Sequence, residues 1–452
     1  MKILIAGAGV IGGSVAEALT EEGHDLTVID CNPDTVRHLS NTVDAICVEG
    51  DAADPELLRE AGAADADLFV AATEKDEVNM VCGIIAHKLG AQHVIARIRD
   101  PRYLHQTEFL RSALGLSQIV NPEYECARQI SRILHFPSAA RVVTFSKGSV
   151  EIVEHRIPEG GALAGMKICD VFRRFRSQVL IALIDRAGKP IIPSGETLLL
   201  AGDRLSITGS TAELRKFFHE IGEYKKPVRR VMIMGGSRTA VYLTRMLQES
   251  GIDVTIVELS RDRCDALCDA VPKAHVVCGD FTHADVLLED GILAADGFVS
   301  LTGDDGDNIV TSLYARSCHV SKIVTTVNRV HFADILYEAG LDSVVPPKEL
   351  VAQQLARYVR ALGNSSDSSV ETLYRVAGGV EVLEFLVHEG AACALKPLRE
   401  LKLRPEVLIV TLIRGNKSIR PDGSTRILPG DHAVVVTAHK LNSLDDILET
   451  KP

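Results

Sequence analysis

The sequence predicts an α/β protein with two similar halves, each a doubly wound parallel-sheet domain followed by a small α+β domain. Apolar runs of strand length alternate with helical stretches, which is typical of parallel sheets covered by helices on both faces. A glycine-rich segment follows the first run and returns 228 residues later, close to half of the 452 residues. An internal repeat of this size has to be recognised before a fold is assigned.

The composition agrees with several globular domains. A chain of 452 residues is too long for a single core. Tryptophan is absent and aromatic residues make up 4%, so Val, Ile, Leu and Ala must build the cores, as in buried parallel strands. The net charge of −12 disfavours non-specific binding to nucleic acid or anionic lipid. No run reaches the roughly 18–20 apolar residues of a membrane span, and we expect no signal peptide.

The first parallel-sheet domain is expected over residues 1–139. Its strands are predicted at ILIA, LTVID, AICVEG, DLFVAAT and VIARI, with helices between them, beginning with Gly13–Glu22. Asp54 and Pro55 mark a helix start, because Asp caps free N–H groups and Pro fits the first helical position. The amphipathic stretch near residues 123–134 predicts an exit or crossover helix.

A small α+β domain is expected over residues 140–224. Short alternating strands with turns at Ala187-Gly188 and Ser194-Gly195, and one helix, indicate hairpins. Residues 228–362 repeat the first domain and residues 370–452 repeat the small one.

Two connecting segments complete the predicted organisation. The basic stretch at 225–230 is interpreted as a solvated linker, with a polyanion-binding patch as the alternative. The segment GNSSDSS at 363–369 is interpreted as a flexible linker.

The first glycine-rich segment predicts a dinucleotide site in a Rossmann-like domain. Gly7 permits the sharp turn after the first strand, Gly9 lets the backbone approach a pyrophosphate, and Gly12 lets the helix pack closely. The start of the helix then offers free N–H groups to the phosphate. Asp30, at the end of the second strand, can accept hydrogen bonds from the ribose hydroxyls, and it would repel a 2′-phosphate, which favours NAD over NADP.

Further residues of this first candidate site follow from the same strand order. Val10 and Ile11 begin the helix after the glycines. Asp51 and Ala52 follow the third strand, where Asp51 either contacts the base or caps the next helix. Other candidates leave the fourth and fifth strands and are Thr73, Arg97 and Arg99. One arginine could reach the phosphates or the nicotinamide ribose, while the other joins a surface ion pair.

The second copy differs at the glycines. Gly235 keeps the turn, Ser237 replaces the middle glycine and Ala240 replaces the third. The Ser237 side chain either crowds a phosphate or donates to it. Glu258 keeps the ribose acceptor. The remaining candidates are Arg238, Thr239, Asp280 and Thr302. This site is predicted either to bind a nucleotide, the same one or a different one, or to be a structural copy.

No catalytic or metal-binding constellation is predicted. The ten cysteines form no C-x-x-C pair, and the fifteen histidines show no ligand spacing. Cys264 and Cys268 stand four positions apart, and we interpret them as buried or half-buried residues, with a metal or redox pair as the alternative. Scattered thiols in a large chain are typical of a reducing cytoplasm.

The sequence resembles the TrkA family, the peripheral regulatory subunits of Trk-type potassium uptake systems. The matching segments are AGAGVIG at 6–12, residues 50–73, DEVNMV at 76–81 and IARIRDPRY at 95–103, and the layout returns at 233–329. Members of this family are a fused pair of RCK (regulator of potassium conductance) units, each with a Rossmann-like N-lobe and a small C-lobe.

The resemblance carries functional expectations. It implies binding of NAD+, NADH or adenine nucleotides such as ATP and ADP, and assembly into a ring as a homotetramer. It implies a partner on the membrane, a potassium transporter of the TrkH/TrkG type met at its cytoplasmic face, and no nucleic acid. Two alternatives stay open at this point, an NAD-dependent dehydrogenase and a soluble nucleotide sensor with another partner.

Overall fold

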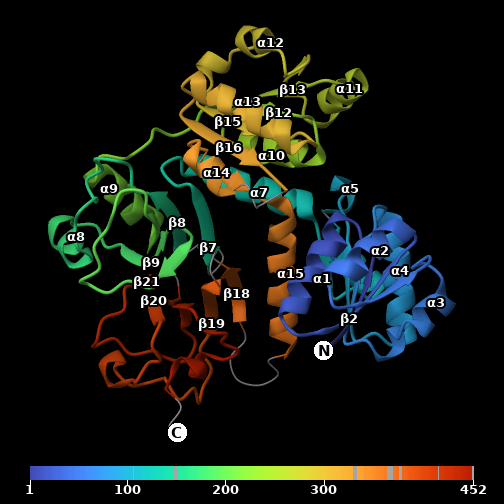
Figure 1. Ribbon diagram of the computed structural model, residues 1–452, viewed down its shortest axis with the longest axis horizontal. Helices are drawn as coiled ribbons and strands as arrows, with labels where there is room; N and C mark the ends of the chain where they lie inside the picture. The colour runs from blue at the N-terminus through green and yellow to red at the C-terminus, as the bar shows by residue number, and fades with distance from the viewer. Residues whose placement is uncertain are drawn as a thin grey trace.

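The computed structural model describes residues 1–104, 106–145, 150–328, 333–341, 343–363, 370–375, 379–415 and 417–449. Within them lie two six-stranded parallel sheets and two five-stranded antiparallel sheets (Figure 1). The predicted fold class is therefore confirmed. No helix among the described residues is long and apolar enough to cross a membrane.

The first N-lobe is a parallel sheet in the order β3-β2-β1-β4-β5-β6. Its strands are β1 (Lys2–Ala6), β2 (Asp25–Asp30), β3 (Ile46–Glu49), β4 (Leu68–Ala71), β5 (His93–Arg97) and β6 (Gln118–Val120). Its helices are α1 (Val10–Glu21), α2 (Pro33–Thr42), α3 (Pro55–Glu60), α4 (Asp76–Leu89), α5 (Pro101–Leu104), α6 (Thr107–Leu114) and α7 (Pro122–His135). The strand order reverses between β1 and β4, which is where such sheets open a binding crevice at their carboxyl ends.

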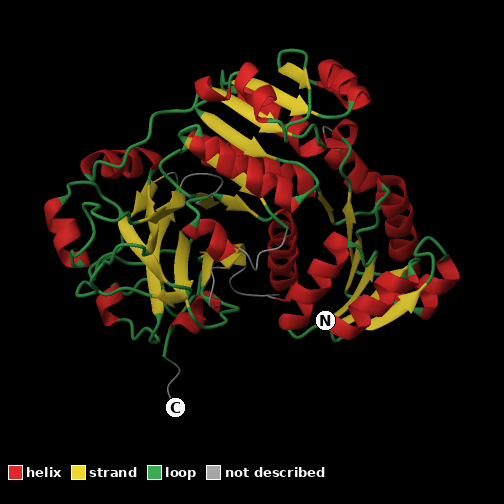
Figure 2. Ribbon diagram, turned by 45° about the horizontal axis from the view of Figure 1, so that its top comes forward, coloured by secondary structure: helices red, strands yellow, loops and turns green. Residues whose placement is uncertain are grey.

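The second N-lobe repeats this order as β14-β13-β12-β15-β16-β17. Its strands are β12 (Arg230–Met234), β13 (Asp253–Glu258), β14 (His275–Cys278), β15 (Gly297–Ser300), β16 (Lys322–Thr326) and β17 (Val344–Val345). Its helices are α10 (Arg238–Glu249), α11 (Arg261–Ala270), α12 (Ala284–Glu289), α13 (Asp305–Ser317), α14 (Ala333–Glu338) and α15 (Pro347–Gly363). Figure 2 shows helices on both faces of this sheet.

The two C-lobes are antiparallel sheets that pack against each other. The first has β7 (Arg141–Phe145), β8 (Val150–Arg156), β9 (Leu180–Arg186), β10 (Lys189–Ile191) and β11 (Arg204–Gly209), with α8 (Ile168–Arg174) and α9 (Thr211–Glu220). The second has β18 (Val370–Arg375), β19 (Glu381–Leu386), β20 (Val407–Arg414), β21 (Lys417–Ile419) and β22 (His432–Thr437). One apolar cluster joins Phe145 and Ile152 of the first sheet to Val382 and Val434 of the second.

The last helix of each N-lobe packs on the other N-lobe. The α7 side chains Ile130 and Leu134 belong to the core of the second N-lobe, while Val351 and Leu355 of α15 belong to the core of the first. In Figure 1, α15 stands beside α1 and α7 runs beneath α10. The stretch predicted as an exit or crossover helix is therefore a crossover helix, and burial of its apolar face ties the two N-lobes together.

Two predicted connectors turn out differently. The stretch at 225–230 is only partly solvated, because Val228 is buried in the core of the second N-lobe and Arg230 already begins β12. The basic side chains are exposed, as the solvated-linker interpretation expects, but Val228 anchors the linker in the core and the linker ends before Arg230. The other predicted linker, 363–369, lies outside the described residues except for Gly363, which ends α15.

Candidate functional site

The first crevice is shaped by two glycines that the fold itself requires. Gly7 has φ +101°, and a Cβ there would lie 2.8 Å from the backbone of Ala72 on the neighbouring strand. A Cβ on Gly12 would lie 1.8 Å from the carbonyl oxygen of Gly7. A side chain at either position would therefore push the turn and α1 away from the sheet.

Gly9 serves no such packing need. A Cβ there would meet no protein atom within 4 Å, and Gly9 precedes α1 without any side-chain cap on the helix. Of the next two residues, Val10 is exposed and Ile11 is buried. The start of α1 therefore has open space beside Gly9 and no side-chain acceptor for its first N–H groups, an arrangement that suits an anionic group.

Asp30 lies at the end of β2, beside this loop. Its carboxylate accepts hydrogen bonds from the Ala8 N–H at 2.6 Å and from the Asn32 N–H at 2.8 Å. These bonds hold the glycine loop against β2. Because each carboxylate oxygen has two acceptor positions, Asp30 keeps capacity for ribose hydroxyls.

Asp51, Ala52 and Thr73 line the loops after β3 and β4. Asp51 is exposed and accepts from the Ala53 N–H at 2.9 Å, whereas Asp54 caps α3 by accepting from the Glu56 N–H. The interpretation of Asp51 as the helix cap is therefore wrong. Ala52 is buried, and the Thr73 hydroxyl donates to Asn79 Oδ1 at 2.7 Å.

Arg97 and Arg99 both form partly buried ion pairs. Arg97 Nη2 lies 3.2 Å from Glu123 Oε1, with the two side chains 14% and 20% exposed. Arg99 pairs with Asp76 at 3.3 Å and lies 3.9 Å from Glu123. Neither pair lies on the open surface, which corrects the expected surface pair.

The environment of Arg97 is only partly satisfied. Burial lowers the pKa of the Arg97 guanidinium, against the raising effect of Glu123. Arg97 Nε and Glu123 Oε2 are buried without a hydrogen-bond partner among the described residues. Since Glu123 lies in the first turn of α7, these guanidinium groups connect the crevice to the crossover helix.

Sequence reasoning missed three residues that organise this crevice, Asp76, Asn79 and Glu123. The buried Asn79 amide donates to the carbonyl oxygens of Thr73 and Arg97 at 3.1 and 2.9 Å. Asp76 accepts from the Arg99 N–H at 2.8 Å. The recurrence of Asp and Asn at 305 and 308 was the available signal for the first two, whereas nothing local marked Glu123.

The second crevice keeps the glycine turn and the acidic residue at the strand end, but the start of its helix is capped by a side chain. Gly235 has φ +92°, and the buried Glu258 accepts from the Gly236 N–H at 2.6 Å. The Ser237 hydroxyl caps α10 by accepting from the Ala240 N–H at 3.4 Å. The helix start that is uncapped in the first crevice therefore has its own acceptor here.

The rest of the second crevice carries different charges. The Thr302 hydroxyl donates to Asn308 Oδ1 at 2.8 Å, as in the first copy. Thr326 and Asn328 occupy the positions of Arg97 and Arg99. Asp280 accepts from Thr282, which lowers the Asp280 pKa.

One cationic residue lies at the start of α10 instead. Arg238 is exposed there, next to the buried Thr239. The two crevices thus present positive charge from different elements.

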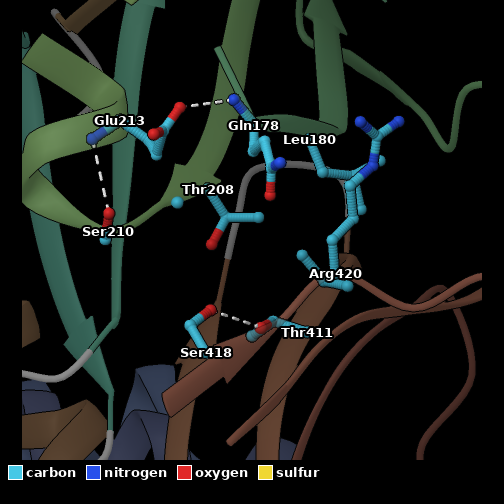
Figure 3. Close-up of a pocket in the computed structure, with 10 residues that line it drawn as sticks. Gln178, Leu180, Thr208, Ser210, Glu213, Thr411, Ser418 and Arg420 are labelled. Carbon is cyan, nitrogen blue, oxygen red and sulfur yellow. Dashed lines mark hydrogen bonds between the residues drawn. The ribbon is translucent and has the colours of Figure 1, made fainter. Parts of the chain in front are cut away.

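A separate cavity of about 180 Å³ is lined by residues of both C-lobes (Figure 3) and by no residue of either glycine loop. Glu213 in its wall accepts from the Gln178 N–H at 2.6 Å, and the hydroxyls of Thr411 and Ser418 lie 3.0 Å apart. Much of the polar lining is therefore engaged within the protein. Among the described residues no group of three or more His, Cys, Asp or Glu side chains is arranged to hold a metal ion.

Comparison with known proteins gives matches over almost the whole chain. The family model of the TrkA-N domain matches residues 3–122 and 231–347, and that of the TrkA-C domain matches residues 152–222 and 382–448. A Trk system potassium uptake protein TrkA from Haemophilus influenzae is 32% identical over 450 residues, which cover 98% of this chain and 97% of the relative. That from Vibrio alginolyticus is 30% identical over 447 residues, covering 97% and 96%.

Solved structures share the fold. The GsuK channel bound to NAD has a TM-score of 0.63 at 23% identity, with 96% of this chain and 76% of that chain covered. GsuK bound to ADP has a TM-score of 0.53 at 19% identity, with 79% and 69% covered.

Proposed function

The chain belongs to the TrkA family, the regulatory subunits of potassium uptake systems, and from this premise we propose that nucleotides in its crevices gate a membrane potassium transporter. The observation that carries the proposal is the first crevice. There the uncapped start of α1 meets open space at Gly9, and Asp30 lies at the end of β2 beside the glycine loop, the position that holds the adenosine ribose in such folds.

NAD+ or NADH is the ligand proposed for this first crevice. A dinucleotide would place its pyrophosphate on the N–H groups of Val10, Ile11 and Gly12, and its ribose hydroxyls on Asp30. Asp51, Ala52 and Thr73 would border the adenine and the second ribose. The solved GsuK structures bound to NAD and to ADP support an adenine nucleotide in this fold.

The second crevice is proposed to take a nucleotide with a different phosphate arrangement. Because a Cβ at Gly9 would meet open space, the fold does not require glycine there, and its replacement by Ser237 reflects the ligand. Glu258 would hold the ribose. Arg238 would pair with phosphate oxygens, the role proposed for Arg97 and Arg99 in the first crevice. ATP or ADP fits this description.

We propose that Glu123 couples the first crevice to the rest of the protein. A pyrophosphate competes for the guanidinium groups of Arg97 and Arg99 and so weakens their attraction to Glu123. Glu123 begins α7, whose apolar face lies in the core of the second N-lobe. A ligand that binds the two positions of α7 with different affinity shifts their populations.

Exposed apolar residues on equivalent helices of the two N-lobes favour assembly of several copies. Val81 on α4 and Val310 on α13, which occupy equivalent positions, are both exposed apolar residues. Exposed apolar side chains at matching positions favour contacts between copies. We propose that a homotetramer forms a ring on the inner face of the cell membrane, against a TrkH/TrkG-type transporter.

The nucleotide is proposed to act as a signal that the protein leaves intact. A dehydrogenase would need an acid/base residue poised beside a nicotinamide ring. Steady change of absorbance at the NADH band with candidate substrates would favour that alternative. Co-purification with a protein other than a potassium transporter would favour a sensor with another partner.

Calorimetric titration tests the assignment of the crevices. NAD+, NADH, ATP and ADP are titrated into the wild type, Asp30→Ala and Glu258→Ala. Asp30→Ala should weaken dinucleotide binding by about 1–3 kcal/mol, the scale of a lost polar contact. Asp34→Ala, an exposed carboxylate on α2, is the matched control. Unchanged affinity in Asp30→Ala would remove Asp30 from the site.

Glu123→Gln tests the coupling. The neutral side chain releases Arg97 for the pyrophosphate and leaves Arg99 paired with Asp76 alone, so NADH affinity should rise while the response of potassium flux to NADH in transporter proteoliposomes falls. Glu125→Gln is the control, since Glu125 forms an ion pair with Arg128, three residues further along the same helix. Flux that ignores saturating NADH and ATP in the wild type would contradict nucleotide gating altogether.

A further inference from the structure

Two cysteines from separate elements meet behind Glu258 in the second N-lobe. Cys264 lies on α11 and is 4% exposed. Its Sγ lies 3.4 Å from the carbonyl oxygen of Glu258 and 4.0 Å from that of Val277. Cys278 is exposed at the end of β14, in register with Glu258 on β13. The two cysteines therefore share the carboxyl ends of two paired strands.

The two cysteines lie on the same face of the sheet, because Val276 packs against the core cluster to which α11 contributes, and Cys278, two positions further along β14, points to the same side. Burial and a hydrogen bond with the Cys278 thiol raise the pKa of Cys264 to about 11. Cys264 is buried as expected, but Cys268, which was expected to be buried or half-buried, is exposed. The partner of Cys264 is thus the residue that follows Val277 and not the residue one helical turn away.

This pair exists in only one half of the protein. The equivalent positions in the first N-lobe hold Val36 on α2 and Glu49 on β3. Neither can form a disulfide. The first N-lobe therefore provides an internal reference for any effect of oxidation on the second.

We propose that Cys264 and Cys278 form a reversible disulfide when a hydroperoxide oxidises the exposed Cys278. The Cys278 thiolate attacks one peroxide oxygen and breaks the O–O bond, which leaves a sulfenic acid and, with a proton, one molecule of water or alcohol. The Cys264 sulfur then attacks the Cys278 sulfur and displaces hydroxide, which leaves as water with the Cys264 proton. Two thiols and one peroxide thus give one disulfide, and a dithiol reductant reverses the step.

The disulfide acts on the wall of the second crevice. Oxidation removes the S–H donor of the Glu258 carbonyl oxygen and joins α11 to β14. The Glu258 carboxylate holds the Gly236 N–H and the Ser260 N–H at 2.6 and 2.9 Å. The glycine loop and Ser260, which precedes α11, are therefore both hydrogen-bonded to Glu258, the residue beside the proposed disulfide. Intracellular disulfides of this kind are usually transient and redox-sensing.

Peptide mapping tests the proposal on the full-length reduced protein. The protein is treated with hydrogen peroxide near stoichiometry, free thiols are alkylated, and peptides are mapped by mass spectrometry without reductant. A peptide pair that joins Cys264 to Cys278 should appear and should vanish after treatment with dithiothreitol. Cys268→Ser is the matched control and should cross-link as the wild type does. Cys278→Ser should leave Cys264 reduced.

A second variant and a second measurement test the proposal in case Cys278→Ser folds poorly. Cys264→Val places the residue of the first N-lobe in the same position and should leave Cys278 as a sulfenic or sulfinic acid. In the oxidised wild type, amide hydrogen exchange over residues 260–279 should slow on the order of tenfold, while residues 32–50 stay unchanged. A dominant Cys268–Cys278 cross-link, an over-oxidised Cys278 beside an alkylatable Cys264, or unchanged exchange in the cross-linked protein would overturn the proposal.

Discussion

Replacing Arg360 should loosen the junction between the first N-lobe and the second C-lobe. Arg360 on α15 donates to Glu22, which caps the end of α1, at 3.0 and 2.6 Å, and to Glu381 on β19 at 2.7 and 2.9 Å. Lys440 Nζ lies 2.9 Å from the Glu22 carboxylate. The side chains of Glu22, Arg360 and Glu381 are only 1%, 5% and 8% exposed. These contacts join two carboxylates to two cations, whose formal charges sum to zero.

The expected cost follows from this burial. Removing one partner of a buried ion pair costs about 3–5 kcal/mol, because it leaves an uncompensated buried charge. Arg360→Met keeps an unbranched side chain and abolishes four charge-assisted hydrogen bonds. The local free energy of opening at this junction should therefore fall by about 3–5 kcal/mol. α1 begins at the glycine loop and ends next to Glu22. The loss should therefore also weaken the connection that runs through α1 from the first crevice to the second C-lobe.

Hydrogen exchange is the suitable assay, since a protein of several lobes does not unfold in two states. Amide exchange in α15 and β19 should accelerate in Arg360→Met, and the first calorimetric transition should shift to lower temperature. Arg37→Met is the control, because the Arg37–Asp34 pair is 73% and 85% exposed and should change stability by less than about 1 kcal/mol. A change in Arg360→Met as small as in this control would refute the reasoning.

Two further predictions follow from the loop and the interface between the N-lobes. Gly12→Ala should destabilise the first N-lobe by several kcal/mol, since its Cβ would lie 1.8 Å from the Gly7 carbonyl oxygen. Gly9→Ala, in contrast, should keep the wild-type melting temperature and should lose NADH affinity in calorimetry. A Gly9→Ala variant that unfolds would show that the loop needs this glycine without any ligand. Tyr242→Phe should cost about 1–2 kcal/mol in calorimetric stability, because the hydroxyl bonds the Arg99 carbonyl oxygen at 2.7 Å and Asn121 Nδ2 at 3.0 Å. Wild-type stability in Tyr242→Phe would mean that water replaces both bonds.

Local patterns predicted the crevices better than their surroundings. Gly7, Gly12 and Asp30 lie where the motif requires, because turn, helix start and strand end are set by residues close in sequence. Ser237 was recognised as a departure, yet its role as a helix cap depended on the rotamer that the structure shows. The domain boundaries near residues 139 and 362 stay predictions.

Long-range pairings could not be predicted in this way. Arg97 and Arg99 were singled out, but Glu123, which pairs with Arg97 and lies 3.9 Å from Arg99, carries no signal of its own. A Cys264–Cys268 pair was raised only as an alternative, because helical spacing is visible in a sequence, whereas the approach of Cys278 depends on the register between β13 and β14.

The sequence by itself determined the duplication, the alternation of strands and helices and the position of both glycine loops. Each of these features depends on residues a few positions apart or on a direct repeat of the sequence. Only the tertiary structure decided which lobe receives α7 and α15, which acids neutralise Arg97, Arg99 and Arg360, and which cysteine meets Cys264. The physical reason is that exchanged helices and buried ion pairs join segments up to 338 positions apart, where the geometry of packing, and not local backbone preference, selects the partner.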